Sequence, residues 1–341
     1  MRLKRLHNLD YLRGLTSLGI MIFHYLTWNY GEFSAENILG RIGLYGVSIF
    51  YCLSGLTLFT VYYDGMTPTF NEVGIFLRRR IFRIFPLLWL ATFLTIILSA
   101  LQFNIILIIL NLTGIFGFIK WHAYLATGAW SIGNELVFYV FFPIFILLSK
   151  RYRALFYIFC FLLFGIYCVF AFGIIKNTES IELQWKNYVN PLNQVFLFLG
   201  GFLLGFIFKS VKTPNSINIA IISLSLLLFI FYPVSGNTVN LITGFNRLIF
   251  TFISLAICFG FYKLSVELPK FIHKPLTILG ESSYSVYLLH PIVYLAIMPF
   301  FKSHLPYFNV VGLGFLIIIS LLLSYYIYQY VEKYFIKMAR K

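Results

Sequence analysis

Long apolar runs constrain the fold of this chain more than any other feature. A run of about 20 apolar residues can cross the ~30 Å hydrocarbon core of a bilayer as one α-helix. Only 11% of the residues are charged, against about 25% in a soluble domain. The sequence therefore predicts an all-α polytopic integral membrane protein. The candidate spans are 9–28, 41–63, 81–101, 104–119, 130–149, 154–175, 190–208, 216–234, 245–263, 278–300 and 309–331.

Basic residues at the ends of these runs predict the topology, because cytoplasmic loops are enriched in Lys and Arg. The first five positions carry three basic residues. If the segment 104–119 crosses the membrane, the basic turn at 150–153 and the basic C-terminal segment lie on the outer side. If it does not cross, both lie in the cytoplasm. We therefore expect about ten transmembrane helices with both termini cytoplasmic. The segment 104–119 is expected to be re-entrant or interfacial.

The net charge of +15 could indicate a nucleic-acid partner, but no basic stretch with interleaved aromatics lies in a soluble module. A topology signal that also meets anionic membrane lipids explains it better. The longest connections, 64–80 and 102–129, are too short for an independent fold. We expect one transmembrane domain over 1–341 with no appended soluble domain, in the cell membrane. No pair of histidines and none of the four cysteines has metal-ligand spacing.

Polar residues recur on one face of the first run. Arg13 and His24 lie eleven positions apart, about three helical turns, so they share a face about 16 Å apart along the axis. Asp10 and Ser17 fall on the same stripe. Ionisable residues inside a membrane are costly and typical of functional sites. The structural alternative is an Asp10–Arg13 pair at the inner interface, with His24 hydrogen-bonded across helices.

Two further motifs add charge. Arg80 and Arg83, three apart, suit bidentate capture of phosphate, although a basic span end can be a topology signal alone. The segment WSIGNE places Glu135 about 7–8 Å below the outer surface, at the expected depth of His24. A carboxylate bonded to the imidazole would fix its tautomer and raise its basicity.

The segment GESSYSVYLLHP, 280–291, supplies small and hydroxyl side chains. Gly280 and Ser283 permit close helix approach, and Tyr284 and Tyr287 carry hydroxyls. Such residues commonly join helices within membranes. The role of His290, deep in this span, is left open.

Together these residues predict a phosphate-binding cytoplasmic edge and a base deeper in the membrane. That arrangement suits a donor bound by its phosphates, with its reactive group delivered to the base. An exporter or flippase of a cell-envelope glycan or glycolipid, with no covalent chemistry, could use the same parts. A structural subunit of a cell-envelope synthase is a weaker alternative.

The motifs resemble the membrane-bound acyltransferase-3 family, multi-span acetyl- and acyltransferases that modify exported glycans and lipids. The resemblance rests on LDYLRGL with His24, RRRIFRIFP, WSIGNE and GESSYSVYLLHP, in that order, and covers residue 8 to about 331. The chain departs from it at Tyr11 and Ser48, where relatives often carry Gly and an acid.

The resemblance implies an O-acyltransferase, an O-acetyltransferase first of all. Its donor substrate would be cytoplasmic acetyl-CoA or another acyl-CoA, with no permanently bound cofactor. Its acceptor would be a hydroxyl of an exported glycan, polysaccharide or glycolipid. A homo-oligomer or a separate acyl-transfer partner protein stays open. The implied catalytic residues are His24, Glu135 and Arg13, the coenzyme-binding residues are Arg80 and Arg83, and supporting roles are expected for Asp10, Ser17, Trp130, Ser131, Ser283, Tyr284 and His290.

Overall fold

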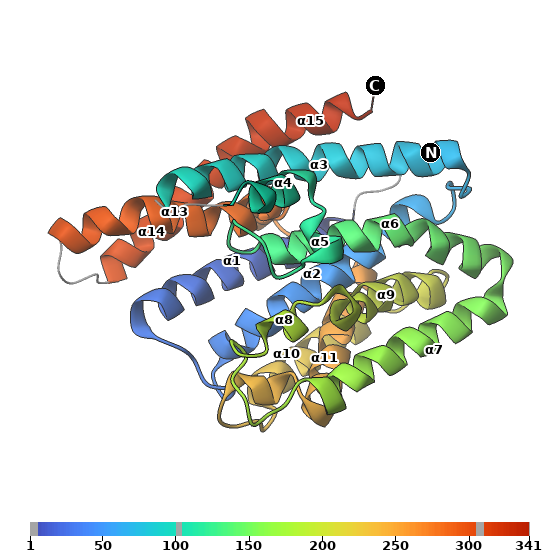
Figure 1. Ribbon diagram of the computed structural model, residues 1–341. Coiled ribbons are helices and arrows are strands. Elements are labelled where there is room, and N and C mark those ends of the chain that lie inside the picture. Colours follow the sequence, from blue (N-terminus) through green and yellow to red (C-terminus); the bar gives the residue numbers. More distant parts are fainter. Residues whose placement is uncertain (1–5, 100–103, 305–309, 341) are drawn as a thin grey trace.

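The computed structural model describes residues 6–99, 104–304 and 310–340. Every regular element in these ranges is helical (Figure 1). The helices are α1 (His7–Tyr30), α2 (Ile38–Tyr62), α3 (Phe70–Leu98), α4 (Ile105–Thr113), α5 (Phe116–Ile119), α6 (Ala129–Arg151), α7 (Arg153–Val169), η1 (Phe170–Ile174), α8 (Trp185–Tyr188), α9 (Pro191–Phe208), α10 (Asn215–Phe231), η2 (Thr238–Leu241), α11 (Gly244–Lys263), α12 (Lys270–Glu281), α13 (Ser283–His304), α14 (Val310–Ile327), η3 (Tyr328–Glu332) and α15 (Lys333–Met338).

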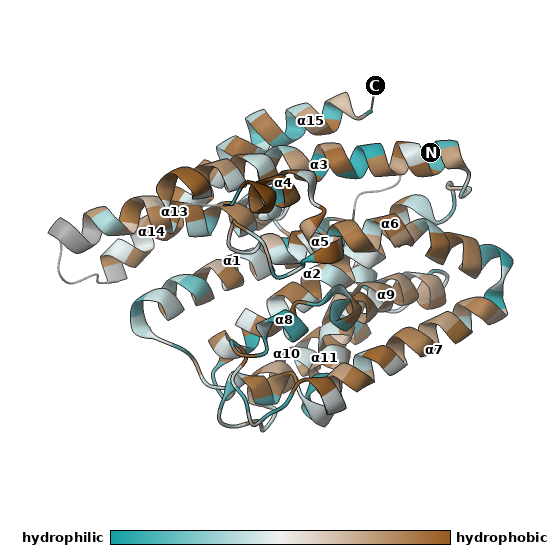
Figure 2. Cartoon of the chain, viewed as in Figure 1, coloured by the Kyte–Doolittle hydropathy of each residue, from teal (hydrophilic) through white to brown (hydrophobic). Residues whose placement is uncertain are grey.

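Eight helical segments in the described chain are long and apolar enough to cross a membrane. They correspond to α2, α3, α6, α7 with η1, α8 with α9, α11, α13, and α14 with η3 and α15. Hydrophobic residues run along these helices, and hydrophilic residues gather in connections such as the α6–α7 turn (Figure 2). The all-α membrane class is confirmed. Helix α1 is not among the eight and α10 has only 17 residues, so the count of ten spans stays a prediction.

The apolar segment 104–119 does not form one long helix. It divides into α4, with 9 residues, and α5, with 4 residues. The break lies at Gly114, whose φ of 72° is in the left-handed region that favours glycine. At 1.5 Å per residue neither helix can cross a core of about 30 Å.

The basic connections gather at one end of the bundle. This agrees with the expectation that they share one side of the membrane, while the side itself remains a prediction from the charge rule. Hydrogen bonds at this end join distant segments, among them Asn8 Nδ2 to the Leu264 carbonyl at 2.5 Å, Lys150 Nζ to the Met66 carbonyl at 3.0 Å, and an Arg78 guanidinium nitrogen to the Ala339 carbonyl at 3.1 Å.

Two glycines let helices approach at backbone distance. A Cβ on Gly201 of α9 would lie 1.9 Å from the Cys52 carbonyl oxygen of α2. A Cβ on Gly280 of α12 would lie 2.1 Å from the Asp10 carbonyl oxygen of α1. The close approach predicted at Gly280 is therefore present. Small residues are typical of such contacts between membrane helices.

The predicted span 278–300 is divided between two helices. Helix α12 ends at Glu281, and α13 begins at Ser283. Helix α12 packs on α1, while α13 packs on α1, α3 and α14. The short break lets one segment contact the start of α1 and the next reach the middle of the bundle, where the candidate site lies.

Candidate functional site

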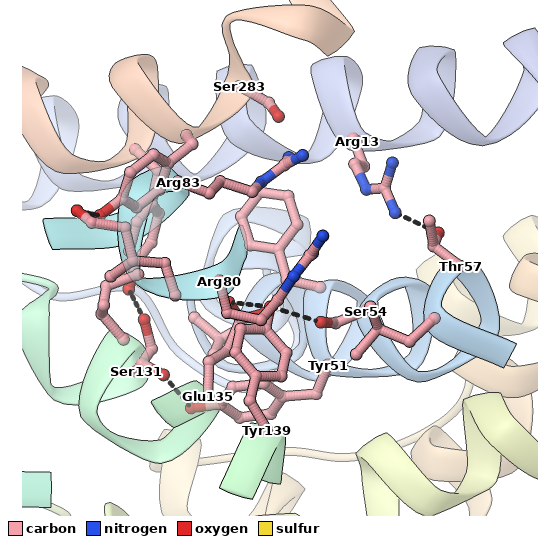
Figure 3. Close-up of a pocket in the computed structure, with 17 residues that line it drawn as sticks. Arg13, Tyr51, Ser54, Thr57, Arg80, Arg83, Ser131, Glu135, Tyr139 and Ser283 are labelled. Atoms are coloured by element: carbon pink, nitrogen blue, oxygen red, sulfur yellow. Dashed lines mark hydrogen bonds between the residues drawn. The ribbon is translucent and has the colours of Figure 1, made fainter. Parts of the chain in front are cut away.

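A cavity lined by both polar and apolar side chains opens among α1, α2, α3, α6 and α13, with about 820 Å³ of empty space including its mouth. Figure 3 shows side chains from these helices projecting into one common space. Most of its polar lining comes from residues far apart in the sequence. These residues are Arg13, Tyr51, Ser54, Thr57, Arg80, Arg83, Ser131, Glu135, Tyr139, Ser283, Tyr284 and Tyr287.

Three arginines and one carboxylate give the cavity an excess of positive charge. Arg13 comes from α1, Arg80 and Arg83 come from α3, and their guanidinium groups point into the same space (Figure 3). Glu135 of α6 is the acid among the lining residues. Burying unbalanced charge is costly. The cavity is therefore arranged to accept an anionic ligand.

Hydrogen bonds within its first turn define the start of α3, the helix that carries Arg80 and Arg83. The Thr69 hydroxyl accepts a hydrogen bond from the Glu72 amide at 3.4 Å, and the Glu72 carboxylate accepts one from the Thr67 amide at 2.8 Å. This reciprocal arrangement is similar to a capping box, which fixes a helix start. Arg80 and Arg83 then fall on one face, as the sequence predicts.

Arg83 is free to bind a ligand. Its side chain is exposed to the cavity. It makes no hydrogen bond within the part of the chain that the structure describes, although a guanidinium carries five donors. A phosphate with several acceptor oxygens is the group that such a fork binds best.

Arg80 is partly satisfied by aromatic side chains. A terminal guanidinium nitrogen donates to the Tyr62 hydroxyl at 3.4 Å, and the group lies 5.7 Å from the Tyr62 ring centroid and 5.9 Å from that of Tyr139. Its Nε is buried without a partner in the described chain. Such a donor costs about 1–3 kcal/mol when left unpaired. An anion in the cavity would remove that cost.

Arg13 is fixed in place by α2 and by its own helix. It donates to the Leu53 carbonyl at 3.1 Å and to the Thr57 hydroxyl. Asp10 lies 3.4 Å away, one turn earlier. The predicted Asp10–Arg13 pair is thus present, and Arg13 also lines the cavity.

Glu135 is bonded to a neighbour on its own helix. The Tyr139 hydroxyl donates to the Glu135 carboxylate at 2.7 Å, and the same hydroxyl lies 2.9 Å from Ser54 Oγ of α2. The pair spans one helical turn, a spacing at which side chains meet. Glu135 therefore belongs to the arginine cavity.

A group of hydroxyls lines the cavity where the start of α6 meets α13. Ser131 Oγ donates to the Tyr287 hydroxyl at 2.9 Å, and that hydroxyl donates to the Gly128 carbonyl at 3.2 Å. These contacts join the start of α6 to α13. His290 follows Tyr287 by three residues on α13, about 4.5 Å along the axis.

His24 does not line the cavity and pairs with His290. Nδ1 of His24 is 2.9 Å from Nε2 of His290. Trp28 lies parallel to His24, with ring centroids 5.0 Å apart and an interplanar angle of 8°. His290 is 1% exposed, whereas His24 keeps part of its surface accessible. His290, whose role the sequence did not indicate, is thus the hydrogen-bond partner of His24.

The predicted His24–Glu135 hydrogen bond is wrong. Ala126 and Ala129 are fully buried, so α6 begins inside the protein and not at its outer surface. The Asn111 side chain holds the preceding loop there, donating to the Ala123 carbonyl at 2.9 Å and accepting from the Leu125 amide at 2.9 Å. Counting depth from residue 130 therefore placed Glu135 too close to the surface.

Cross-helix contacts put Glu135 at the level of Arg13. The Tyr139 hydroxyl joins Glu135 to Ser54, while Arg13 bonds the adjacent Leu53 carbonyl. Helices α1 and α2 are antiparallel, so later residues of α1 contact earlier residues of α2: Ile20 lies beside Gly46, and Phe23 lies beside Gly43. His24 is thus about three turns beyond the acid along α1.

The other predicted residues divide between the cavity and the packing. Ser131, Ser283 and Tyr284 line the cavity, and the Tyr284 hydroxyl also donates to the Ile84 carbonyl at 2.9 Å. Ser17 is fully buried and donates to the Gly14 carbonyl of its own helix at 2.8 Å. The indole of Trp130 lies edge to face against Trp185, with centroids 5.6 Å apart, and packs outside the cavity.

The sequence reasoning missed several lining residues. Tyr51, Ser54 and Thr57 lie on α2, in the stretch 46–59, which has no charged residue to mark a site. Tyr139 carries a usable signal, because it is a hydroxyl one turn from a buried acid. The hydroxyl of Tyr287 is visible in the motif 280–291, but nothing in that motif indicates that this side chain lines the cavity.

Fold and site define a class of protein: a multi-span membrane protein with an arginine-lined cavity among its helices. Residues 6–329 match the sequence model of the acyltransferase-3 family, described as an acyltransferase domain. Since the match covers nearly the whole chain, the protein belongs to that family and is a membrane acyltransferase. Neither a curated protein nor a solved structure matches the chain.

Proposed function

We propose that the protein transfers an acyl group, first of all acetyl, from cytoplasmic acyl-CoA to a hydroxyl of an exported glycan, polysaccharide or glycolipid. The observation that carries this proposal is the cavity in which Arg83 has no hydrogen-bond partner among the described residues, and which ends one helical turn from a pair of histidines on α13. A coenzyme A thioester has phosphates at one end and the reactive group at the other. Its phosphates would lie in the arginine cavity and its thioester near the histidine pair.

Arg80 and Arg83 would bind the coenzyme phosphates. Arg83 makes no hydrogen bond to the described residues, and Arg80 has a buried Nε without a partner among them. Arg13 adds positive charge next to them, although Leu53 and Thr57 already occupy part of its donor set. Two adjacent guanidiniums bind phosphate oxygens more strongly than neutral donors do, by charge-assisted hydrogen bonds.

His24 would act as general base on the acceptor hydroxyl. Its ring would take the hydroxyl proton while the acceptor oxygen attacks the thioester carbonyl. The new carbon–oxygen bond replaces the carbon–sulfur bond, and the proton passes to the departing coenzyme A sulfur. The products are an ester and free coenzyme A. Transient acylation of His24 is the alternative course.

Glu135 receives a different role from the one the sequence indicated. It lies with Tyr139 among the arginines and has no hydrogen bond to His24 within the described residues. We propose that it orients Tyr139 and offsets part of the arginine charge. Ser131, Ser283 and Tyr284 would contact the donor, because they line the same space.

Family membership favours this function over an exporter without covalent chemistry. The cell membrane as location, a single transmembrane domain and direct delivery to the acceptor remain predictions. Anionic lipid at the basic end and a second protein, either another copy or an acyl-transfer partner, also remain predictions.

The test is coenzyme A release by the purified protein in lipid vesicles, with acetyl-CoA and a hydroxyl-bearing glycan. Mass spectrometry of the glycan should show the mass of one acyl group, dependent on protein and donor. Movement of the glycan across vesicles without consumption of acyl-CoA would support the exporter and contradict our proposal.

A further inference from the structure

The hydrogen bonds of His290 determine which of its ring nitrogens carries the hydrogen. Nδ1 of His290 lies 2.9 Å from the Val286 carbonyl oxygen, and Nε2 of His290 lies 2.9 Å from Nδ1 of His24. A carbonyl oxygen can only accept a hydrogen bond. Nδ1 of His290 must therefore carry a hydrogen and donate it to Val286.

That bond decides the state of the other nitrogen atoms. A neutral imidazole has one N–H and one lone pair. With Nδ1 of His290 protonated, its Nε2 holds the lone pair and accepts a hydrogen bond. Nδ1 of His24 must then be the donor, and Nε2 of His24 holds a lone pair.

Ring geometry agrees with this assignment. The two imidazole planes are 16° apart with centroids 5.1 Å apart. With the facing nitrogen atoms only 2.9 Å apart, the rings lie nearly end to end in a common plane. The lone pair of an imidazole nitrogen lies in that plane and so points at the facing N–H.

The surroundings favour a neutral pair. His290 is 1% exposed, and no carboxylate in the described chain contacts either ring. A second proton would place a charge in an apolar setting among Trp28, Tyr25 and Tyr294, which is costly. Nε2 of His24 makes no hydrogen bond within the described residues, so its lone pair is available.

We propose that His290 is a positioning residue that holds His24 in the Nδ1–H tautomer and thereby leaves Nε2 of His24 as the atom that accepts the substrate proton. This inference rests on the proposed function, because it names how the base of that reaction is set. In a serine-protease triad, the loss of the correct tautomer costs about 10⁴ in kcat.

The experiment is nitrogen NMR of the full chain in lipid bilayers, with ¹⁵N in the histidine rings. Comparison with His24→Gln assigns the His24 signals. Wild type is expected to show a protonated Nδ1 and a bare Nε2 for His24. A protonated Nε2 on His24 would overturn the proposal.

Two substitutions at the same position separate positioning from packing. His290→Gln keeps an acceptor oxygen near the place of Nε2, whereas His290→Phe keeps a ring without a lone pair. The Gln variant should keep the Nδ1–H tautomer and a kcat within about tenfold of wild type. The Phe variant should lose that tautomer and about 10²-fold or more in kcat, with KM for acyl-CoA little changed.

A purely structural role predicts a different result. Both variants would then lose activity in parallel, and His24 would keep its Nδ1–H tautomer in His290→Phe; either outcome overturns the proposal. If the Phe variant does not fold, His290→Ala replaces it, since Ala also lacks an acceptor. The tautomer needs no substrate, so absence of acyl transfer in wild type would reject the proposed function and leave this measurement valid.

Discussion

The arginine cavity and the histidine pair lie one helical turn apart on α13, yet they are built in opposite ways. The cavity concentrates charge and leaves Arg83 without a hydrogen-bond partner among the described residues. The histidine pair concentrates hydrogen bonds, with the donor and acceptor roles of its joined nitrogens settled by the Val286 carbonyl. Between them the hydroxyls of Tyr287 and Ser131 and the Gly128 carbonyl bond one another. The difference supports our proposal that anion binding and proton transfer are separate tasks in two adjacent regions, which share α1 and α13.

Substitution of His24 is the most direct test of whether the two regions act separately. Replacing it with Ala removes the proposed base, and general base catalysis contributes about 10²–10⁴ in rate. We expect coenzyme A release to fall by that factor. Binding of acyl-CoA to the vesicle-bound protein, measured by calorimetry, should change less than about twofold, because His24 does not line the cavity.

The matched control for this variant is His122→Ala, which removes an exposed loop histidine and should leave the rate at the wild-type level. Wild-type-like turnover in His24→Ala would remove His24 from the mechanism. A large loss of acyl-CoA affinity would show that the two regions are one site.

The cavity side of the comparison is tested at Arg83. Replacement with Met deletes a charged donor set while keeping a long apolar side chain. A hydrogen bond to a charged group is worth about 1.5–3 kcal/mol, so KM for acyl-CoA should rise about 10- to 100-fold with a smaller change in kcat. Rates over a range of acyl-CoA concentrations provide the measurement.

Arg79→Met controls for the loss of one positive charge on the same helix. Arg79 is exposed and does not line the cavity. Equal effects of the two substitutions would mean that the basic segment acts through topology alone.

Substitution of Glu135 shows to which region this acid belongs, because an effect on KM indicates the cavity and an effect on kcat indicates the histidine pair. Glu135→Gln removes the negative charge among the arginines but keeps an oxygen that accepts from Tyr139. Less opposition to an anion should lower KM for acyl-CoA by about threefold to tenfold, as expected for ~1 kcal/mol of charge interaction. The kcat should stay within about threefold.

The measurement is the same titration as for Arg83, with Glu72→Gln, outside the cavity, as control. If Glu135→Gln instead reduces kcat as strongly as His24→Ala, the acid acts on the histidine after all. The separation inferred from the structure would then fail.

The fold was largely predictable because apolar length and periodicity act locally. The boundaries of α2, α6 and α11 lie within three residues of the predicted runs. Arg80 and Arg83 share a face because α-helical spacing alone requires it. The depth of Glu135 in the membrane was predicted wrongly. The loop before α6 is held inside the bundle by hydrogen bonds to the Asn111 side chain, and no local sequence pattern shows that a loop is buried.

Pairings between distant segments were the second limit. His24 and His290 are separated by 266 positions, and their contact depends on how α1 and α13 cross. The sequence showed two intramembrane histidines and an acid, and the acid is the commoner partner. Only the three-dimensional arrangement selects His290.

The smallest expected effect concerns Ser17, which the sequence places on a polar stripe linking Arg13 to His24. Its hydroxyl is fully buried and donates to the Gly14 carbonyl, so it serves its own helix. Ser17→Ala should change activity less than twofold and the free energy of unfolding by no more than about 0.5 kcal/mol, since Ala favours helix slightly. Thermal unfolding and coenzyme A release test this, with Thr16→Ala, which loses a similar bond to the Leu12 carbonyl, as control. A loss above tenfold in Ser17→Ala alone would mean that a hydrated path follows α1 from cavity to histidines, and that the two regions communicate along that helix and not past Tyr287.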